Sequence, residues 1–157
     1  MGDVTASHVM IPGAWHLDFQ HAAGPAASRF LTTLRDRGVL TASPCPRCSR
    51  VRVPPRDFCE ECFVRTSDDW LDVGPHAVVE AATIGYTSFP GYPEPPYALV
   101  YARPDRADTA IGNFLHGLDL ADYHVALERM HIGARVSAVF AAERSALVTD
   151  FHWVLDD

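Results

Sequence analysis

Two cysteine pairs, Cys45-Pro-Arg-Cys48 and Cys59-Glu-Glu-Cys62, decide the fold of this chain, and they contain the only four cysteines in its 157 residues. Two residues between a pair of thiolates allow a tight turn to direct both sulfurs at one ion. A second such turn on a returning segment completes the tetrahedral four-sulfur geometry that zinc favours. The pattern therefore predicts a metal site. Four protein thiolates leave no open coordination position, so we expect the metal to be structural and not catalytic.

Disulfides and iron are the alternatives to a zinc site. Disulfides belong mainly to secreted proteins, and residues 1–20 have neither the basic start nor the apolar core of a secretory signal. Iron stays open, because tetrahedral thiolate sites suit both metals. The sequence also contains no apolar run of about 18 residues, the length that a membrane span needs. We therefore expect a cytoplasmic protein with no membrane segment.

The segment before and between the cysteine pairs predicts a helix and a ribbon strand. Gly24-Pro25 and Gly38 mark the two ends of a helix over residues 25–37. Three apolar side chains, Phe30, Leu31 and Leu34, recur on one face of it at helical spacing. Residues 49–58 are long enough for two short strands. Within them, residues 51–53 alternate as a strand, which two prolines end.

The segment after the second pair predicts a five-stranded barrel. Runs rich in valine, alanine, threonine and isoleucine predict strands at residues 76–86, 97–103, 109–115, 134–141 and 146–155. Leucine and aromatic spacing within residues 118–130 predicts a short helix between the third and fourth strands. This order matches an OB-type Greek-key barrel.

The expected fold is mainly β and divides into an N-terminal arm (1–23), a helix with a zinc ribbon (24–68) and an OB-fold (69–157). The arm carries Trp15, Leu17 and Phe19, which must pack on the body or on a partner.

Charge is unevenly distributed along the chain. The net charge is −7, which argues against nucleic acid as the main partner. Residues 29–65 nevertheless hold eight arginines and four acidic residues, so this segment is +4 and the remainder accounts for −11. Arginine side chains bind phosphates and carboxylates through bidentate contacts and are common at protein interfaces. The candidates for such contacts are Arg47, Arg50, Arg52 and Arg56, with a merely solvated basic face as the alternative.

The loop over residues 88–97 is a second candidate interaction element. It joins the first two predicted barrel strands and holds four prolines together with Phe89 and Tyr92. Prolines restrict the backbone in advance, so such a loop presents aromatic rings at a small entropic cost. The alternative is a loop that folds down and covers the open barrel with these rings.

Sequence motifs of catalysis are missing from the chain. It contains no G-x-S-x-G elbow, no phosphate-binding glycine loop and no H-E-x-x-H motif. With all four cysteines assigned to metal, no thiol remains as a nucleophile, and none of the eight histidines lies in a catalytic motif. This pattern favours a binding or accessory role.

Taken in order, the motifs resemble a family that joins a rubredoxin-like zinc ribbon to an OB-fold, long catalogued as a domain of unknown function. The matching stretches start with Ser28-Arg-Phe-Leu31 and Leu34-Arg-Asp36, followed by the first cysteine pair, Val53-Pro-Pro-Arg56 and Cys59-Glu-Glu-Cys62-Phe63. They continue with Phe89-Pro-Gly91, Pro96-Tyr97 and Ile132-Gly-Ala-Arg-Val136. The likeness covers residues 24–155. One departure is that Ser49 and Phe63 follow the second cysteine of each pair, where rubredoxin knuckles usually have the glycine that a left-handed backbone favours.

The resemblance implies an accessory subunit. Members of this family accompany thiolase-fold enzymes that make or cleave carbon–carbon bonds in acyl-CoA substrates, and the catalytic residues belong to the partner. It therefore implies a non-catalytic, zinc-containing subunit in a hetero-oligomer, with acyl-CoA near the shared interface. The arginines named above, together with Phe89 and Tyr92, are then the candidate partner-binding or CoA-proximal residues.

Two other functions compete with this interpretation. OB-folds and zinc ribbons both bind nucleic acid through stacked aromatic rings in a positive groove, but the acidic barrel half would repel a phosphate backbone. An independent enzyme acting on acyl-CoA would need a nucleophile or base constellation that the motifs do not supply.

Overall fold

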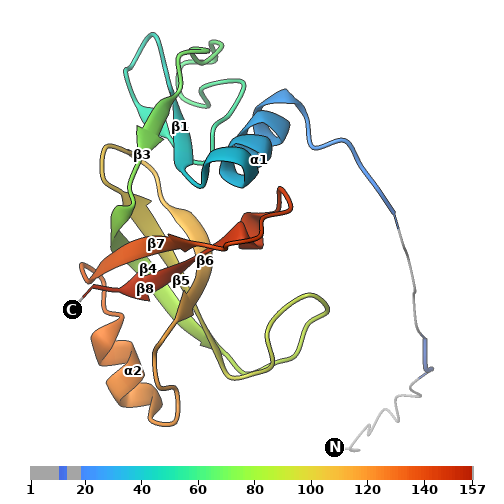
Figure 1. Ribbon diagram of the computed structural model, residues 1–157, viewed down its shortest axis with the longest axis vertical. Coiled ribbons are helices and arrows are strands. Elements are labelled where there is room, and N and C mark those ends of the chain that lie inside the picture. The colour runs from blue at the N-terminus through green and yellow to red at the C-terminus, as the bar shows by residue number, and fades with distance from the viewer. Residues whose placement is uncertain (1–10, 14–18, 157) are drawn as a thin grey trace, which may run out of the picture.

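The computed structural model describes residues 11–13 and 19–156. A small sheet and a helix occupy one end of its long axis, a barrel occupies the middle, and a second helix lies at the other end (Figure 1). Of the aromatic residues expected in the N-terminal arm, Trp15 lies outside the described residues, as does Leu17. Phe19 is described and is 78% exposed.

Helix α1 spans Pro25–Arg37, the bounds that the sequence predicts. Pro25 occupies the first helical position, where its missing N–H costs no hydrogen bond. Gly38 ends the helix in a left-handed conformation with φ of 60°, and its N–H donates to the carbonyl of Leu34 at 3.0 Å. Phe30 and Leu34 are buried on the face that the apolar spacing indicates.

The ribbon side contains a three-stranded antiparallel sheet. Its strands are β1 (Leu40–Pro44), β2 (Val51–Arg52) and β3 (Leu71–Val73), in the order β2-β1-β3. Residues 49–58 therefore form one strand and not two, and β2 pairs with β1. Strand β3 lies between the second cysteine pair and the first predicted barrel strand, where the sequence analysis predicts no strand. It pairs with β1 because Val73 faces the core, while Asp72 points outward and forms an ion pair with Arg37 at 2.6 Å.

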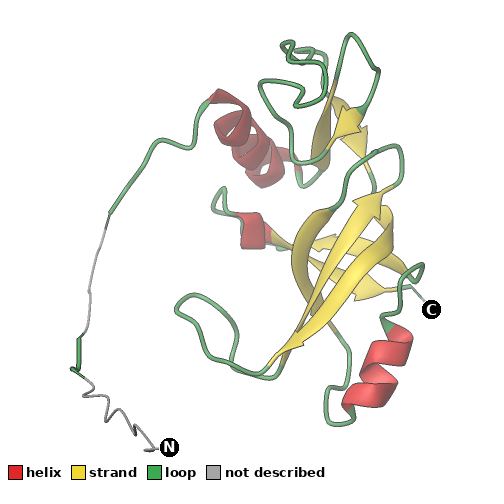
Figure 2. Ribbon diagram, turned by 180° about the vertical axis from the view of Figure 1, so that it is seen from behind, coloured by secondary structure: helices red, strands yellow, loops and turns green. Residues whose placement is uncertain are grey.

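The remainder of the fold is a closed five-stranded barrel with strand order β4-β5-β6-β8-β7. Its strands are the larger group of yellow arrows in Figure 2. Its strands are β4 (His76–Gly85), β5 (Tyr97–Pro104), β6 (Ile111–His116), β7 (Arg135–Phe140) and β8 (Phe151–Leu155). Strand β7 pairs antiparallel with both β4 and β8, and β6 pairs parallel with β8, which closes the ring. A helix between the third and fourth strands completes the OB-type order, so the predicted fold class is confirmed.

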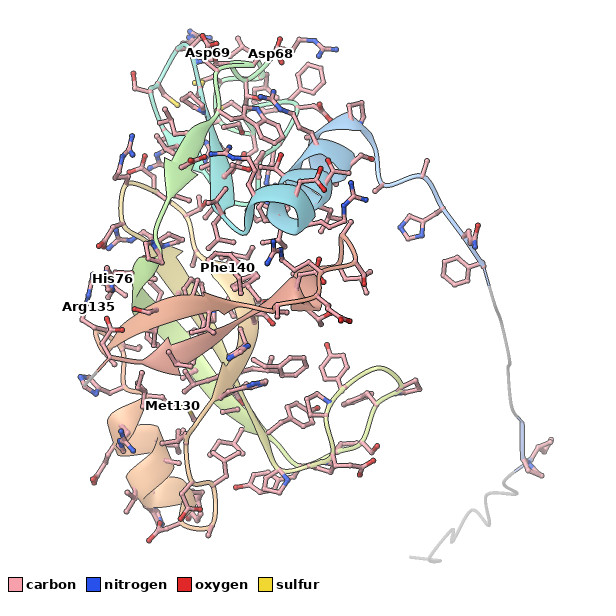
Figure 3. The ribbon with its side chains drawn as sticks, viewed as in Figure 1. Asp68, Asp69, His76, Met130, Arg135 and Phe140 are labelled. Carbon is pink, nitrogen blue, oxygen red and sulfur yellow. The ribbon has the colours of Figure 1, made fainter. Side chains whose placement is uncertain are left out.

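Helix α2 (Tyr123–Arg129) covers the end of the barrel farthest from the ribbon. The carboxylate of Asp122 caps it by accepting hydrogen bonds from the backbone N–H groups of His124 and Val125. Its buried side chains are Ala126 and, just after the helix, Met130, both with no exposed surface. Figure 3 places Met130 where the helix meets the barrel. This helix lies within the longer segment, residues 118–130, that the sequence predicts.

The last strand starts later than its predicted position. A short 3-10 turn, η1 (Val148–Asp150), precedes β8, which begins at Phe151. The carboxylate of Asp150 accepts hydrogen bonds from the backbone N–H groups of Ser145 and Leu147 at 3.0 and 3.1 Å. These local bonds hold the chain in a turn where apolar residues alone predict a strand.

One hydrophobic core joins the two halves of the structure. It runs from Phe30 and Leu34 of α1 through Val53 and Val73 of the ribbon side to the interior of the barrel. Trp153 belongs to this core and has no exposed surface. Because the core is continuous, the ribbon side and the barrel are packed against each other and not merely tethered.

We expect Asn113→Ala to lower the free energy of unfolding by about 3 kcal/mol, because it leaves buried carbonyl groups without a donor. Asn113 is 5% exposed, and its amide donates to the carbonyls of Val148 and Phe151 at 2.9 and 2.8 Å. Urea unfolding measures the loss. Glu143→Ala, at an exposed position, is the control. A loss below about 0.5 kcal/mol, the range of ordinary surface substitutions, would contradict this role of Asn113.

Candidate metal centre and adjoining groove

The two cysteine pairs form two knuckles with the same backbone hydrogen bonds. In the first, Ser49 N–H donates to the carbonyl of Cys45, and Cys45 N–H donates to the carbonyl of Arg50, both at 2.9 Å. In the second, Phe63 N–H donates to the carbonyl of Cys59 at 2.8 Å, and Cys59 N–H donates to the carbonyl of Val64 at 2.9 Å. Equivalent bonds place the two thiols of each pair on the same side of its turn.

Both knuckles adopt the left-handed backbone without glycine. Ser49 has φ of 60° and Phe63 has φ of 54°. This conformation costs a residue with a side chain about 1–2 kcal/mol relative to a right-handed one. The two residues that depart from the usual rubredoxin pattern therefore keep its geometry, at a conformational cost that the surrounding hydrogen bonds offset.

The four cysteine sulfurs, two from each knuckle, lie close together. All four lie within 4.8 Å of one another, and the Cys48 and Cys59 sulfurs are 3.8 Å apart. A tetrahedral zinc ion with Zn–S bonds of about 2.3 Å needs sulfurs separated by about 3.8 Å. None of the four cysteines forms a disulfide. The donor set therefore fits a four-coordinate thiolate site, and Cys45 and Cys59 are its buried members.

Hydrogen bonds to sulfur favour the thiolate form of two cysteines. The backbone N–H groups of Cys48 and Arg47 point at the Cys45 sulfur at 3.5 and 3.4 Å and lower the pKa of that thiol. A terminal guanidinium nitrogen of Arg52 donates to the Cys59 sulfur at 3.2 Å, which lowers the pKa of Cys59 to about 6. Burial raises the pKa of Cys62 when no metal charge is present. A bound cation would hold this thiol in its deprotonated form.

The four candidate arginines occupy different environments. Arg47 and Arg56 are exposed, and Arg50 is exposed while forming an ion pair with Glu61. Arg52 is only 1% exposed. The expectation that Arg52 faces a partner or CoA is therefore corrected, because its guanidinium is turned inward to the metal centre. The residue pattern does not indicate that Arg52 is buried, because an arginine in a basic segment usually lies on the surface.

A groove of about 780 Å³ lies where α1, the ribbon and the barrel meet. Its lining is mostly apolar and includes Phe30 and Leu31 of α1, Val53 after β2, and Tyr101 and Phe114 of the barrel. Arg56 is the one charged side chain among its lining residues. Sequence reasoning missed this groove, because its lining comes from segments more than 100 residues apart.

The proline-rich loop contributes to the groove and stays partly exposed. Tyr92 lines the groove and packs edge-on against Phe114, with ring centroids 5.3 Å apart. Phe89 in turn packs on Tyr92 at 5.8 Å. Both rings are about half exposed, at 52% for Phe89 and 50% for Tyr92. The loop thus folds onto the outside of the barrel and still presents aromatic surface.

A polar cluster on the barrel contains His76, Ser137 and Asp156. The Ser137 hydroxyl donates to the Asp156 carboxylate, and Nδ1 of His76 lies 2.8 Å from that hydroxyl and 3.4 Å from the carboxylate. A catalytic triad places the histidine between serine and acid, with a different ring nitrogen facing each. Here a single nitrogen faces both groups, so the cluster lacks triad geometry. Figure 3 places His76 beside Arg135, on the side of the barrel.

Fold and site together define a class: a four-cysteine zinc ribbon preceded by a helix and followed by an OB-type barrel. A family model described as "ChsH2, rubredoxin-like zinc ribbon domain" matches residues 32–68. This match includes both cysteine pairs and confirms the resemblance for the ribbon. No match was found among curated proteins.

Solved structures of the DUF35 family share the fold. A protein of unknown function from Sulfolobus solfataricus, from the DUF35 family, is 22% identical with a TM-score of 0.61, covering 85% of this chain and 87% of that chain. The structure named "Ltp2-ChsH2(DUF35) aldolase" is 18% identical with a TM-score of 0.57, covering 85% of this chain and 96% of the other. At these identities, the similarity establishes the fold alone. Within residues 11–13 and 19–156, no helix has the length and apolar character that crossing a bilayer requires.

We expect the double substitution Ser49→Gly/Phe63→Gly to raise the free energy of unfolding of the metal-loaded protein by about 1 kcal/mol. Glycine removes the left-handed penalty at both knuckles, and this gain exceeds the added entropy of the unfolded chain. Denaturant unfolding at fixed metal content measures the change. Ser88→Gly is the control, because Ser88 is exposed and its φ is not positive. Equal effects of the control and the double variant would contradict strain at the knuckles.

Proposed function

We propose that this chain is a non-catalytic, zinc-binding accessory subunit of a thiolase-type acyl-CoA enzyme complex, which docks on the catalytic partner and completes it. The observation that carries the proposal is the ChsH2-type ribbon at residues 32–68 on a fold like that of the Ltp2-ChsH2(DUF35) aldolase. In this proposal the carbon–carbon chemistry belongs to the partner, and the present chain supplies binding surface. It would act in the cytoplasm, where its thiols stay reduced.

The proposed cofactor is one Zn²⁺ ion held by Cys45, Cys48, Cys59 and Cys62, with Fe²⁺ as the other metal that suits this donor set. The convergence of the sulfurs within 4.8 Å supports the assignment. With four protein ligands the ion would cross-link the ribbon and would not bind substrate. Its role is to fix the positions of the knuckles, and through them the segment that leads into the groove.

The proposed docking surface combines the exposed arginines Arg47, Arg50 and Arg56 with the aromatic pair Phe89 and Tyr92. Exposed aromatic and arginine side chains are the residue types that contribute most binding energy at protein interfaces. Arg56 and Tyr92 line the groove, and Phe89 packs on Tyr92. We also propose that the chain divides into an arm (1–23), a helix with ribbon (24–68) and an OB-fold (69–157).

The groove is the proposed contact with acyl-CoA at the shared interface. Its apolar lining suits an acyl chain, and Arg56, its charged lining residue, would pair with a phosphate or carboxylate of the ligand. Arg52 takes no part in this contact, because its side chain is buried.

The test is native mass spectrometry of the tagged chain isolated from its own host. We expect a stable assembly that contains a thiolase-sized partner and one zinc ion per copy of this chain. In the reconstituted complex, Arg56→Glu should raise the apparent KM for acyl-CoA or weaken assembly by about tenfold, the loss expected for one charge-assisted contact. Arg129→Glu, on the exposed side of α2, is the matched control.

Three outcomes would contradict the proposed function. The first is isolation of the chain without a partner under conditions that preserve complexes. The second is turnover of an acyl-CoA by the purified chain alone. The third is a tight, salt-sensitive complex with single-stranded oligonucleotides, which would favour the nucleic-acid alternative.

A further inference from the structure

Arg52 is an unusual charged residue in this structure. It lies on the two-residue strand β2, between the two knuckles, and its side chain is 1% exposed. It is the largest charged side chain among the fully buried residues of the described chain. Removing a guanidinium from water is unfavourable unless anionic partners compensate for the lost hydration. The groups that contact the Arg52 guanidinium therefore indicate the role of this residue.

Three anionic groups lie near the Arg52 guanidinium. One terminal nitrogen donates to the Cys59 sulfur at 3.2 Å and lies 3.9 Å from the Glu61 carboxylate. Nε lies 3.1 Å from the Glu60 carboxylate but forms no well-aligned hydrogen bond. Both glutamates are about half exposed, whereas Cys59 is fully buried. The sulfur is thus the buried partner of the buried charge.

The backbone on either side of Arg52 is fastened to the barrel. Val51 N–H donates to the Asp108 carboxylate, and Asp108 N–H donates to the Val51 carbonyl, both at 2.8 Å. Val53 N–H donates to the Thr109 hydroxyl at 2.8 Å, and that hydroxyl donates to the Val53 carbonyl at 2.9 Å. Since Asp108 and Thr109 belong to the connection between β5 and β6, the position of Arg52 is fixed by the barrel and not by the ribbon alone.

The two knuckles are not equivalent in their sulfur contacts. Backbone N–H groups lie at the sulfurs of both Cys45 and Cys59, and Cys59 alone also receives a charged side-chain donor. Hydrogen bonds to a metal-bound thiolate stabilise its negative charge and orient the sulfur, and the loss of such an outer-shell partner weakens metal binding. A four-thiolate zinc centre carries two net negative charges, and a buried cation beside it reduces the repulsion among its sulfurs.

We propose that Arg52 is a positioning residue of the metal centre, which holds the Cys59 thiolate in place from the barrel side and thereby slows release of the metal. The proposal rests on the assignment of the four cysteines as metal ligands, and it is independent of the thiolase-type partner. Arg52 couples the retention of the ion to the packing of the ribbon on the barrel, through the hydrogen-bonded residues Val51 and Val53.

The experiment uses the full-length, zinc-loaded chain and three substitutions. Arg52→Met removes the charge while keeping most of the side-chain volume. Arg52→Lys keeps a charge but loses the planar donor group. Arg50→Met is the matched control, because Arg50 lies two residues away in the same ribbon, is exposed and pairs with Glu61. Metal release to an excess of a chromophoric chelator is followed at fixed pH, with circular dichroism as a check of folding.

We expect Arg52→Met to release zinc about 10- to 100-fold faster than the unsubstituted chain, the range found when an outer-shell partner of a metal ligand is removed. Arg52→Lys should be intermediate, and Arg50→Met should match the unsubstituted chain. In Co²⁺-substituted protein, the sulfur-to-cobalt charge-transfer band should move to lower energy in Arg52→Met, because the thiolate loses a hydrogen bond. The shift should be smaller in Arg52→Lys, whose ammonium keeps a charge and N–H donors but not the reach and planar geometry of the guanidinium. A purely structural loss of packing would not shift that band.

The proposal would be overturned if Arg52→Lys released zinc as slowly as the unsubstituted chain and left the cobalt band unshifted. This test holds even if Arg52→Met fails to fold. Acceleration by Arg50→Met equal to that by the Arg52 variants would also overturn it, because the effect would then arise from ribbon charge in general. A wild-type chain that holds no metal would refute the metal site itself. A metal-loaded chain without a thiolase-sized partner would refute only the proposed function.

Discussion

The meeting of four cysteine sulfurs at one point is the constraint on which the ribbon depends. The knuckles and their connection contain few buried apolar side chains, chiefly Val53 and the cysteines Cys45 and Cys59. A segment with so small a core cannot offset its conformational entropy by hydrophobic burial alone. Covalent bonds from sulfur to one ion supply the missing free energy in zinc ribbons, and the matching hydrogen bonds of the two knuckles prepare the chain for that ion.

The metal centre and the groove share one short piece of chain. Strand β2 carries Arg52 to the Cys59 sulfur, and the residues that follow, Val53 to Arg56, form one wall of the groove. The hydrogen bonds from Val51 and Val53 to Asp108 and Thr109 fasten the same piece to the barrel. A displacement of the knuckles would therefore be transmitted to the groove wall within three residues. A purely structural ion would therefore influence the shape of a groove that it does not touch.

The features that could be predicted from sequence are those with local signals. Helix α1 has its predicted bounds because a proline at its start and a left-handed glycine at its end mark both termini. The barrel strands were recognisable from β-branched runs, and the sulfur cluster from cysteine spacing. The features that could not be predicted depend on long-range contacts. Strand β3 exists because Leu71 and Val73 pair with β1. Arg52 is buried against the Cys59 sulfur, only seven residues away, but through a fold of the ribbon that residue types alone do not indicate.

Charge separation along the molecule has a consequence for how it meets other molecules. The arginine and acidic side chains of residues 29–65 sum to +4 and those of the rest of the chain to −11, and a zinc ion on four thiolates would add −2 and leave the segment at +2. Figure 1 places the ribbon at one end of the long axis. The protein is therefore an electric dipole as well as an anion. In the field of a charged surface it experiences a torque that turns the ribbon toward negative potential before any contact forms. This orienting effect extends over one Debye length, roughly 8 Å at physiological ionic strength. Added salt shortens that length, so the protein would approach a charged surface in less defined orientations.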